Sequence, residues 1–270
     1  MKAKHFFLIF AATLLSSCEK VVYIDLNTST PHMVVESNII NGNGPFTVKL
    51  SRSVNYYDGN SFPAVTGATV VLSDNGNSEV LKETDAGTYR SGSTNGIPGH
   101  IYRLSITTAD GKVYTSSSTM PAPVPIDSIT VELRGKSDNN NAQNTLSSRY
   151  RVTCSFKDPA NEVNFYRLIL TSNDTAFKQN RINIISDKLT DGQEIYLTAN
   201  GRFIPGDSLH VTLQSIDMAT YDFYNTLTAV EGDRPNFLSA PPANPTNNIS
   251  NGALGYFSAY SVTRKSYIIH

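Results

Sequence analysis

A strand pattern and a tight turn follow one another in Ala68-Thr69-Val70-Val71-Leu72-Ser73-Asp74-Asn75-Gly76-Asn77. Ala68, Val70 and Leu72 occupy alternate positions, which is typical of a strand with one buried face. The four residues from Asp74 to Asn77 form a turn signal, because Asn and Gly tolerate the positive φ that hairpin turns require. A second strand is therefore expected over Glu79–Glu83.

The same alternation recurs on both sides of this hairpin. Strands are predicted over Val34–Ile39 and Phe46–Ser51, and a second hairpin joins Ile101–Thr108 to Val113–Ser118. Roughly seven short strands in about 90 residues, separated by turn signals, predict an immunoglobulin-like β-sandwich.

A proline-rich segment, Met120–Asp127, interrupts the strands. Alternating prolines stiffen the chain and cannot donate ladder hydrogen bonds, so this segment is predicted to connect two domains. The polar stretch Gly135–Ser148 is predicted to be a mobile loop. The remaining predicted strands are Ser128–Leu133, Tyr150–Lys157, Phe165–Thr171, Glu194–Thr198, Leu209–Ile216 and Ala253–Val262.

One helix is expected, over about Ala219–Val230. Asp217 is placed to act near its N-terminal cap. Tyr221, Tyr224 and Leu227 then form an apolar stripe at helical spacing.

The prediction is an all-β chain of two consecutive immunoglobulin-like or fibronectin-like β-sandwich domains, with one short helix in the second. Its segments are a lipoprotein signal peptide (1–17), a lipidated tether (18–31), an N-terminal sandwich (32–119), a Pro-rich linker (120–127) and a C-terminal sandwich (128–270) with the helix near 219–230.

The N-terminal segment has the features of a secretory signal. Lys2 and Lys4 precede the uncharged run Phe6–Leu15, and Leu15-Ser16-Ser17-Cys18 follows. A ten-residue apolar helix would span roughly 15 Å, half of a bilayer core, so it is no transmembrane anchor. The expectation is a lipid on Cys18 that holds the protein on a membrane. The alternative is a secreted protein with a chance cysteine.

Charge and cysteine content exclude several classes of function. Without residues 1–17, 20 of the 22 basic residues remain against 23 acidic ones, with both signs scattered, so no nucleic-acid partner is expected. The other cysteine, Cys154, alternates with Val152 and Phe156 on one strand face. It is expected to be a buried, unreactive thiol.

Motifs for catalysis are missing from the sequence. It has no His-Glu-x-x-His, Cys-x-x-Cys, Gly-x-Ser-x-Gly or dinucleotide fingerprint. No catalytic residue, cofactor or metal is therefore predicted. Asp187, Asp191 and Asp207 lie in turn-rich sequence and could ligate calcium, but aspartates are favoured in turns without any metal.

An aromatic loop is the favoured binding segment. Tyr56, Tyr57 and Phe62 stand on a polar, glycine-containing loop, where they could dock a partner protein or a sugar ring. Alternatively, the rings fold back over the end of the sandwich. A second candidate surface is Asn247–Tyr260, in which Gly252 and Gly255 suggest a special turn or bulge before the last strand. The alternative, which is favoured, is a purely structural role for this segment.

Several runs, taken in order, resemble the Bacteroidetes lipoprotein family known as domain of unknown function 4249. The runs are Cys18-Glu19-Lys20, Val34-Val35-Glu36, Phe46-Thr47-Val48-Lys49-Leu50-Ser51-Arg52, Val65-Thr66-Gly67-Ala68-Thr69-Val70, Gly87-Thr88-Tyr89, Gly99-His100-Ile101-Tyr102-Arg103-Leu104, Pro125-Ile126-Asp127-Ser128-Ile129, Asn248-Ile249-Ser250-Asn251-Gly252 and Leu254-Gly255-Tyr256-Phe257. The resemblance implies an envelope lipoprotein associated with TonB-dependent outer-membrane transport. Glu19, directly after the lipidated cysteine, is similar to the start of a surface-export signal, so surface exposure is favoured over a periplasmic location.

The leading functional hypothesis is a non-enzymatic, membrane-anchored accessory protein that binds a TonB-dependent receptor, its ligand or both. The alternatives are a fimbrial subunit built by strand exchange, a glycan-binding surface lipoprotein and an envelope hydrolase. The absence of Trp counts against strong sugar stacking.

Overall fold

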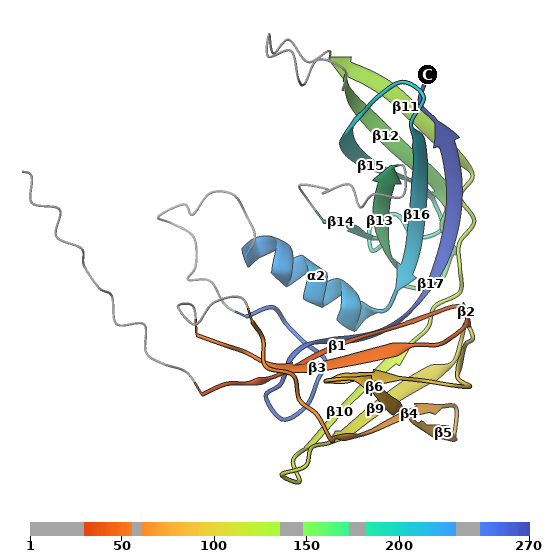
Figure 1. Ribbon diagram of the computed structural model, residues 1–270. Coiled ribbons are helices and arrows are strands. Elements are labelled where there is room, and N and C mark those ends of the chain that lie inside the picture. The colour runs from red at the N-terminus through yellow and green to blue at the C-terminus, as the bar shows by residue number, and fades with distance from the viewer. Residues whose placement is uncertain (1–29, 56–60, 136–147, 173–181, 231–243) are drawn as a thin grey trace, which may run out of the picture. The chain divides into compact units, whose positions relative to one another are not determined.

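Strands dominate the computed structural model of the chain, which describes residues 30–55, 61–135, 148–172, 182–230 and 244–270 (Figure 1). One helix, α2 (Met218–Val230), lies among the described residues, so the predicted all-β class with a single helix is confirmed. The N-terminal segment with Cys18 and the expected mobile loop between Gly135 and Ser148 lie outside the described residues. In the described ranges, no helix is long and apolar enough to span a membrane.

The described strands form four sheets. The largest has the order β14 (Asn183–Ser186), β13 (Phe165–Ser172), β16 (Ser208–Ile216), β17 (Leu254–Ile268), β1 (Met33–Ile40), β3 (Thr47–Arg52), β7 (Thr88–Arg90), β6 (Lys82–Asp85). A four-stranded sheet has the order β10 (Val113–Thr119), β9 (Ile101–Thr107), β4 (Thr69–Asp74), β5 (Asn77–Val80). The smaller sheets are β11 (Ser128–Gly135), β12 (Ser148–Lys157), β15 (Glu194–Phe203) and β2 (Gly42–Asn43), β8 (Asn95–Gly96).

The predicted hairpin is present, but the strand after it is not continuous. Asn75 and Gly76 form the turn between β4 and β5, with φ of 43° and 99°. The expected strand Glu79–Glu83 is wrong, because β5 ends before Leu81 and β6 begins after it. Leu81 is buried, and its N–H donates to the Val70 carbonyl oxygen at 2.9 Å. The chain passes at this residue from the four-stranded sheet to the eight-stranded sheet.

Strand β17 connects strands from the two halves of the chain. Residues 254–260 pair in parallel with β1, and residues 261–268 pair antiparallel with β16. The close approach to β1 depends on Gly255, which has φ of 94° and whose Cβ, if it had one, would collide with the Val35 carbonyl oxygen. The strand extends to Ile268 instead of the expected Val262, because β16 provides a backbone partner along this whole half.

Two large hydrophobic clusters make up most of the core. The Pro-rich segment 120–127 contributes Met120 to the first cluster and Val124 and Ile126 to the second, and it contains no strand. Phe257 of β17 packs in the first cluster, although the sequence assigned this region to the second sandwich. Pro31–His270 forms one compact unit, and its division into two sandwich domains stays a prediction.

Candidate binding pocket

A buried hydrogen-bond network joins the end of β10 to the start of α2. The Ser118 hydroxyl donates to Asp217 Oδ2 at 2.6 Å and accepts the N–H of Ala259 of β17 at 2.8 Å. Asp217 Oδ1 accepts the Thr220 N–H at 2.9 Å, which confirms the predicted N-terminal cap. The Thr220 hydroxyl in turn donates to Ser258 at 2.8 Å. Three segments far apart in sequence are thereby fixed to one another.

The predicted apolar stripe of α2 packs against the eight-stranded sheet. Tyr221 lies 4.8 Å from Phe165 between ring centroids, and Tyr224 is buried. Arg167 donates to the Tyr224 hydroxyl at 2.9 Å and lies 4.0 Å from its ring centroid. Burial raises the pKa of Tyr224, so its hydroxyl stays protonated. These contacts hold the first two turns of the helix beside the sheet.

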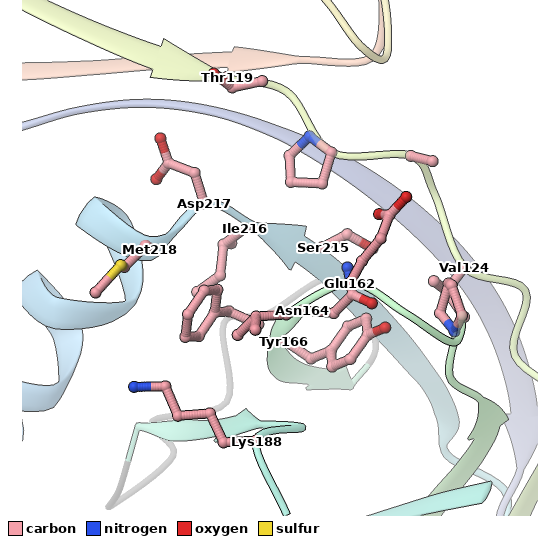
Figure 2. Close-up of a pocket in the computed structure, with 15 residues that line it drawn as sticks. Thr119, Val124, Glu162, Asn164, Tyr166, Lys188, Ser215, Ile216, Asp217 and Met218 are labelled. Carbon is pink, nitrogen blue, oxygen red and sulfur yellow. The ribbon is translucent and has the colours of Figure 1, made fainter. Parts of the chain in front are cut away.

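A cavity of about 630 Å³ opens beside the start of α2 and the end of β10 (Figure 2). Its size falls within the range of small-ligand pockets, roughly 300–1,000 Å³. The lining comes from four separate segments of the chain. These residues are Thr119, Pro121, Ala122, Val124, Pro159, Glu162, Val163, Asn164, Phe165, Tyr166, Lys188, Ser215, Ile216, Asp217 and Met218.

The pocket combines largely apolar walls with a few polar side chains, among them Glu162, Asn164 and Lys188. Asn164 Oδ1 is buried and has no hydrogen-bond partner among the described residues. The Tyr166 hydroxyl is already engaged, since it donates to Asp158 at 2.5 Å. Because the Asn164 oxygen is closed to solvent, a molecule in the cavity would contact the apolar walls rather than this acceptor.

Apolar side chains at and beside the pocket are exposed to solvent. Val163 is 59 % exposed, and Met218 is 55 % exposed. Leu189, directly after the lining residue Lys188, is 93 % exposed. Exposed apolar side chains gathered beside a cavity are typical of a surface that binds another molecule.

Phe62, one of the three residues predicted to bind a partner, is not among the residues that line this pocket. Tyr56 and Tyr57 lie outside the described residues, and Phe62 is 60 % exposed on a different part of the chain. Their binding role, like the lipid on Cys18, stays a prediction. In the second candidate surface, Gly252 and Gly255 have positive φ and precede or enter β17, as the expected special turn requires.

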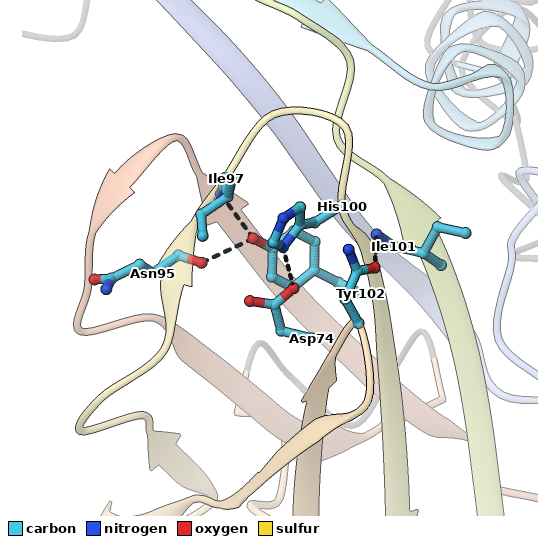
Figure 3. Close-up of polar contacts among 7 residues, drawn as sticks. Asp74, Asn95, Ile97, His100, Ile101 and Tyr102 are labelled. Atoms are coloured by element: carbon cyan, nitrogen blue, oxygen red, sulfur yellow. Dashed lines mark hydrogen bonds and ion pairs between the residues drawn. The ribbon is translucent and has the colours of Figure 1, made fainter.

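A cluster of polar contacts lies at one end of the four-stranded sheet (Figure 3). His100 Nδ1 lies 2.6 Å from Asp74 Oδ1, and the Tyr102 hydroxyl donates to the Asn95 carbonyl at 2.8 Å. The Ile97 N–H donates to the same hydroxyl at 2.7 Å. In the part of the chain that the structure describes, no hydroxyl or thiol hydrogen-bonds to the His100 ring. The cluster therefore fastens the β4–β5 turn to the segment before β9.

Cys154 occupies the predicted position on the buried face of β12. It is fully buried, as are Val152 and Phe156. Burial raises the pKa of the Cys154 thiol to about 11. A protonated and inaccessible thiol is no nucleophile at neutral pH.

Two of the three turn aspartates that could ligate calcium come together. Asp187 and Asp191 lie with Asp158, a residue that the sequence analysis did not single out. Asp207 lies elsewhere, and its carboxylate accepts the Ile204 N–H at 2.9 Å within its own turn. Asp158 follows directly after β12. Its position at the end of the predicted strand Tyr150–Lys157 is the sequence feature that could have identified it as a member of the cluster.

The family comparison covers almost the whole chain. A family model described as "Domain of unknown function (DUF4249)" matches residues 19–266. The search of curated proteins finds no match.

Proposed function

The chain belongs to the DUF4249 family, and we propose that it is a lipid-anchored, non-enzymatic binding protein of the cell envelope. The observation that carries the proposal is the pocket between the Pro-rich segment and α2. Its apolar walls and its exposed apolar rim suit the capture of a molecule that presents an apolar group.

The expected lipid anchor would place this pocket at a membrane surface. Leu15-Ser16-Ser17-Cys18 closes a signal sequence, and lipid on Cys18 would hold the protein at the outer membrane, with surface exposure favoured. Confinement to a membrane raises the effective concentration toward any partner in the same membrane. Modest affinity at the pocket is then sufficient for lasting association.

The proposed partner is a TonB-dependent receptor. This assignment is supported by the family resemblance of the sequence, and the pocket offers a place where a receptor segment or the transported ligand would dock. The second proposed contact is the aromatic loop with Tyr56, Tyr57 and Phe62, because Phe62 is exposed and available to a partner.

Crosslinking of the native lipoprotein in its own membrane, followed by mass spectrometry, tests the proposal. Recovery of a TonB-dependent receptor supports a transport accessory. Recovery of the protein alone, in a ladder of polymers, would instead favour a fimbrial subunit. Retention on a polysaccharide affinity gel without any protein partner would favour a glycan-binding lipoprotein.

A further inference from the structure

Three carboxylates converge where two loops meet at the ends of strands. Asp158 follows β12, Asp187 follows β14, and Asp191 lies in the turn before β15. One oxygen from each lies within 4.8 Å of the other two. Asp158 and Asp187 are 2 % and 0 % exposed, respectively, whereas Asp191 is open to solvent. Two carboxylates of the cluster are therefore buried, and the third is accessible from solvent.

Backbone and hydroxyl donors hold the carboxylates in position. The Gly192 N–H donates to Asp158 Oδ2 at 2.9 Å, and the Asn164 N–H donates to Asp187 Oδ2 at 2.9 Å. The Asn161 N–H donates to both oxygens of Asp191, at 3.0 and 3.2 Å. Each oxygen has two lone pairs, so these bonds orient the carboxylates and still leave them acceptor capacity.

A second observation indicates that the cluster lacks a positive group. Asp187 Oδ1 is fully buried and has no hydrogen-bond partner among the described residues. None of the Lys, Arg or His side chains in the described ranges forms an ion pair with the three carboxylates. The ammonium of Lys157 instead donates to the Gly192 carbonyl oxygen at 2.5 Å. A buried carboxylate oxygen without a donor or cation is costly.

Electrostatics support the same conclusion. Three carboxylates this close repel one another, and a divalent cation would remove that repulsion.

We propose that Asp158, Asp187 and Asp191 bind a Ca²⁺ ion. The ligand set is all oxygen and includes neither His nor Cys, which disfavours zinc. Ca²⁺ accepts irregular carboxylate geometry and open positions filled by solvent, whereas Mg²⁺ demands near-octahedral geometry. The ion would tie the loop of residues 158–164 to the loop of residues 187–192. Both loops contribute to the lining of the pocket, but the metal site rests on its own geometry and does not depend on the proposed function.

Terbium luminescence of the detergent-solubilised full-length protein gives a direct test. Tb³⁺ replaces Ca²⁺ in oxygen sites, and Tyr166, whose hydroxyl donates to Asp158, is placed to sensitise it. We expect saturable luminescence that CaCl₂ displaces and that MgCl₂ displaces only weakly. CaCl₂ alone should also raise the unfolding temperature, because an ion that binds only the folded state stabilises it.

Substitutions at the site and a matched control complete the experiment. Asp187→Asn should weaken Tb³⁺ binding about tenfold or more, by loss of a ligand charge. Asp191→Asn should weaken it as well, and since Asp191 is exposed, this variant keeps the experiment decisive if Asp187→Asn fails to fold. Asp207→Asn is the control and should bind like the wild type. Absence of a calcium-dependent shift, or equal loss in all three variants, would overturn the proposal.

Discussion

Ser118 and Asp217 are 99 residues apart in the chain and share a hydrogen bond of 2.6 Å. The same aspartate caps α2 through the Thr220 N–H, so one carboxylate holds both the end of β10 and the start of the helix. The pocket opens directly beside this bond, since Thr119 and Asp217 both line it. The shape of the candidate site therefore depends on a contact that is long-range in sequence.

Replacement of this carboxylate should destabilise the protein. Asp217→Ala removes the cap and leaves the Ser118 hydroxyl without its acceptor, at a cost of about 1–3 kcal/mol in the free energy of unfolding. Urea denaturation followed by circular dichroism measures it. The control is Asp222→Ala on the same helix, for which we expect a change within about 0.5 kcal/mol. Equal effects of the two substitutions would show that the hydrogen bonds of Asp217 contribute nothing to the free energy of unfolding.

Substitution of Gly255 and of Gly252 by Ala provides a second pair of variants whose stabilities can be compared. Both have positive φ, but only at Gly255 would a Cβ collide with backbone, the Val35 carbonyl. Gly252→Ala should cost about 1–2 kcal/mol from φ alone. Gly255→Ala should cost about 2–5 kcal/mol, because steric overlap is added to the strain. If thermal unfolding ranks the two variants the other way, β17 does not approach β1 as closely as described.

The thiol of Cys154 should be unreactive in the folded protein. In a Cys18→Ser variant, a thiol reagent at pH 8 should modify no cysteine until urea unfolds the chain, because Cys154 is buried and its pKa is raised to about 11. The unfolded thiol, with a pKa near 9.0, ionises first, so stability should fall as the pH rises from 9 to 11. Rapid modification under native conditions would contradict this placement.

The aromatic loop provides a prediction about partner binding. Replacement of Tyr56, Tyr57 and Phe62 by Ala should weaken binding of the crosslinked partner and leave the unfolding temperature unchanged, because Phe62 is 60 % exposed. Affinity is measured with the purified partner and the variant. Unchanged affinity would dismiss the loop as a contact.

Local features of the fold were predictable, and features that depend on distant partners were not. The Asn75-Gly76 turn and the Asp217 cap each follow from a few neighbouring residues. Strand β15, in contrast, continues to Phe203, beyond the end predicted at Thr198, because β12 pairs with it along its whole length. The transfer of β17 from β1 to β16 has no local signal at all.

The candidate sites show the same limit. The pocket is lined by residues near 119–124, 159–166, 188 and 215–218, and in sequence each segment resembles an ordinary strand end or turn. Two of the three members of the acidic cluster, Asp187 and Asp191, were named from the sequence as possible calcium ligands. Its third member is Asp158 and not Asp207, because strand pairing, and not spacing, decides which turns meet.

The proposed function requires that the pocket binds a partner or ligand while lipid on Cys18 anchors the protein. Site-specific photocrosslinking in native membranes tests it most directly, with the crosslinker at Val163 on the rim or at Val80, a valine exposed to a similar degree (64 % against 59 %) on β5. We expect a specific adduct, identified by mass spectrometry, from Val163 and none from Val80. The same adducts from both positions, or none from either, would contradict it.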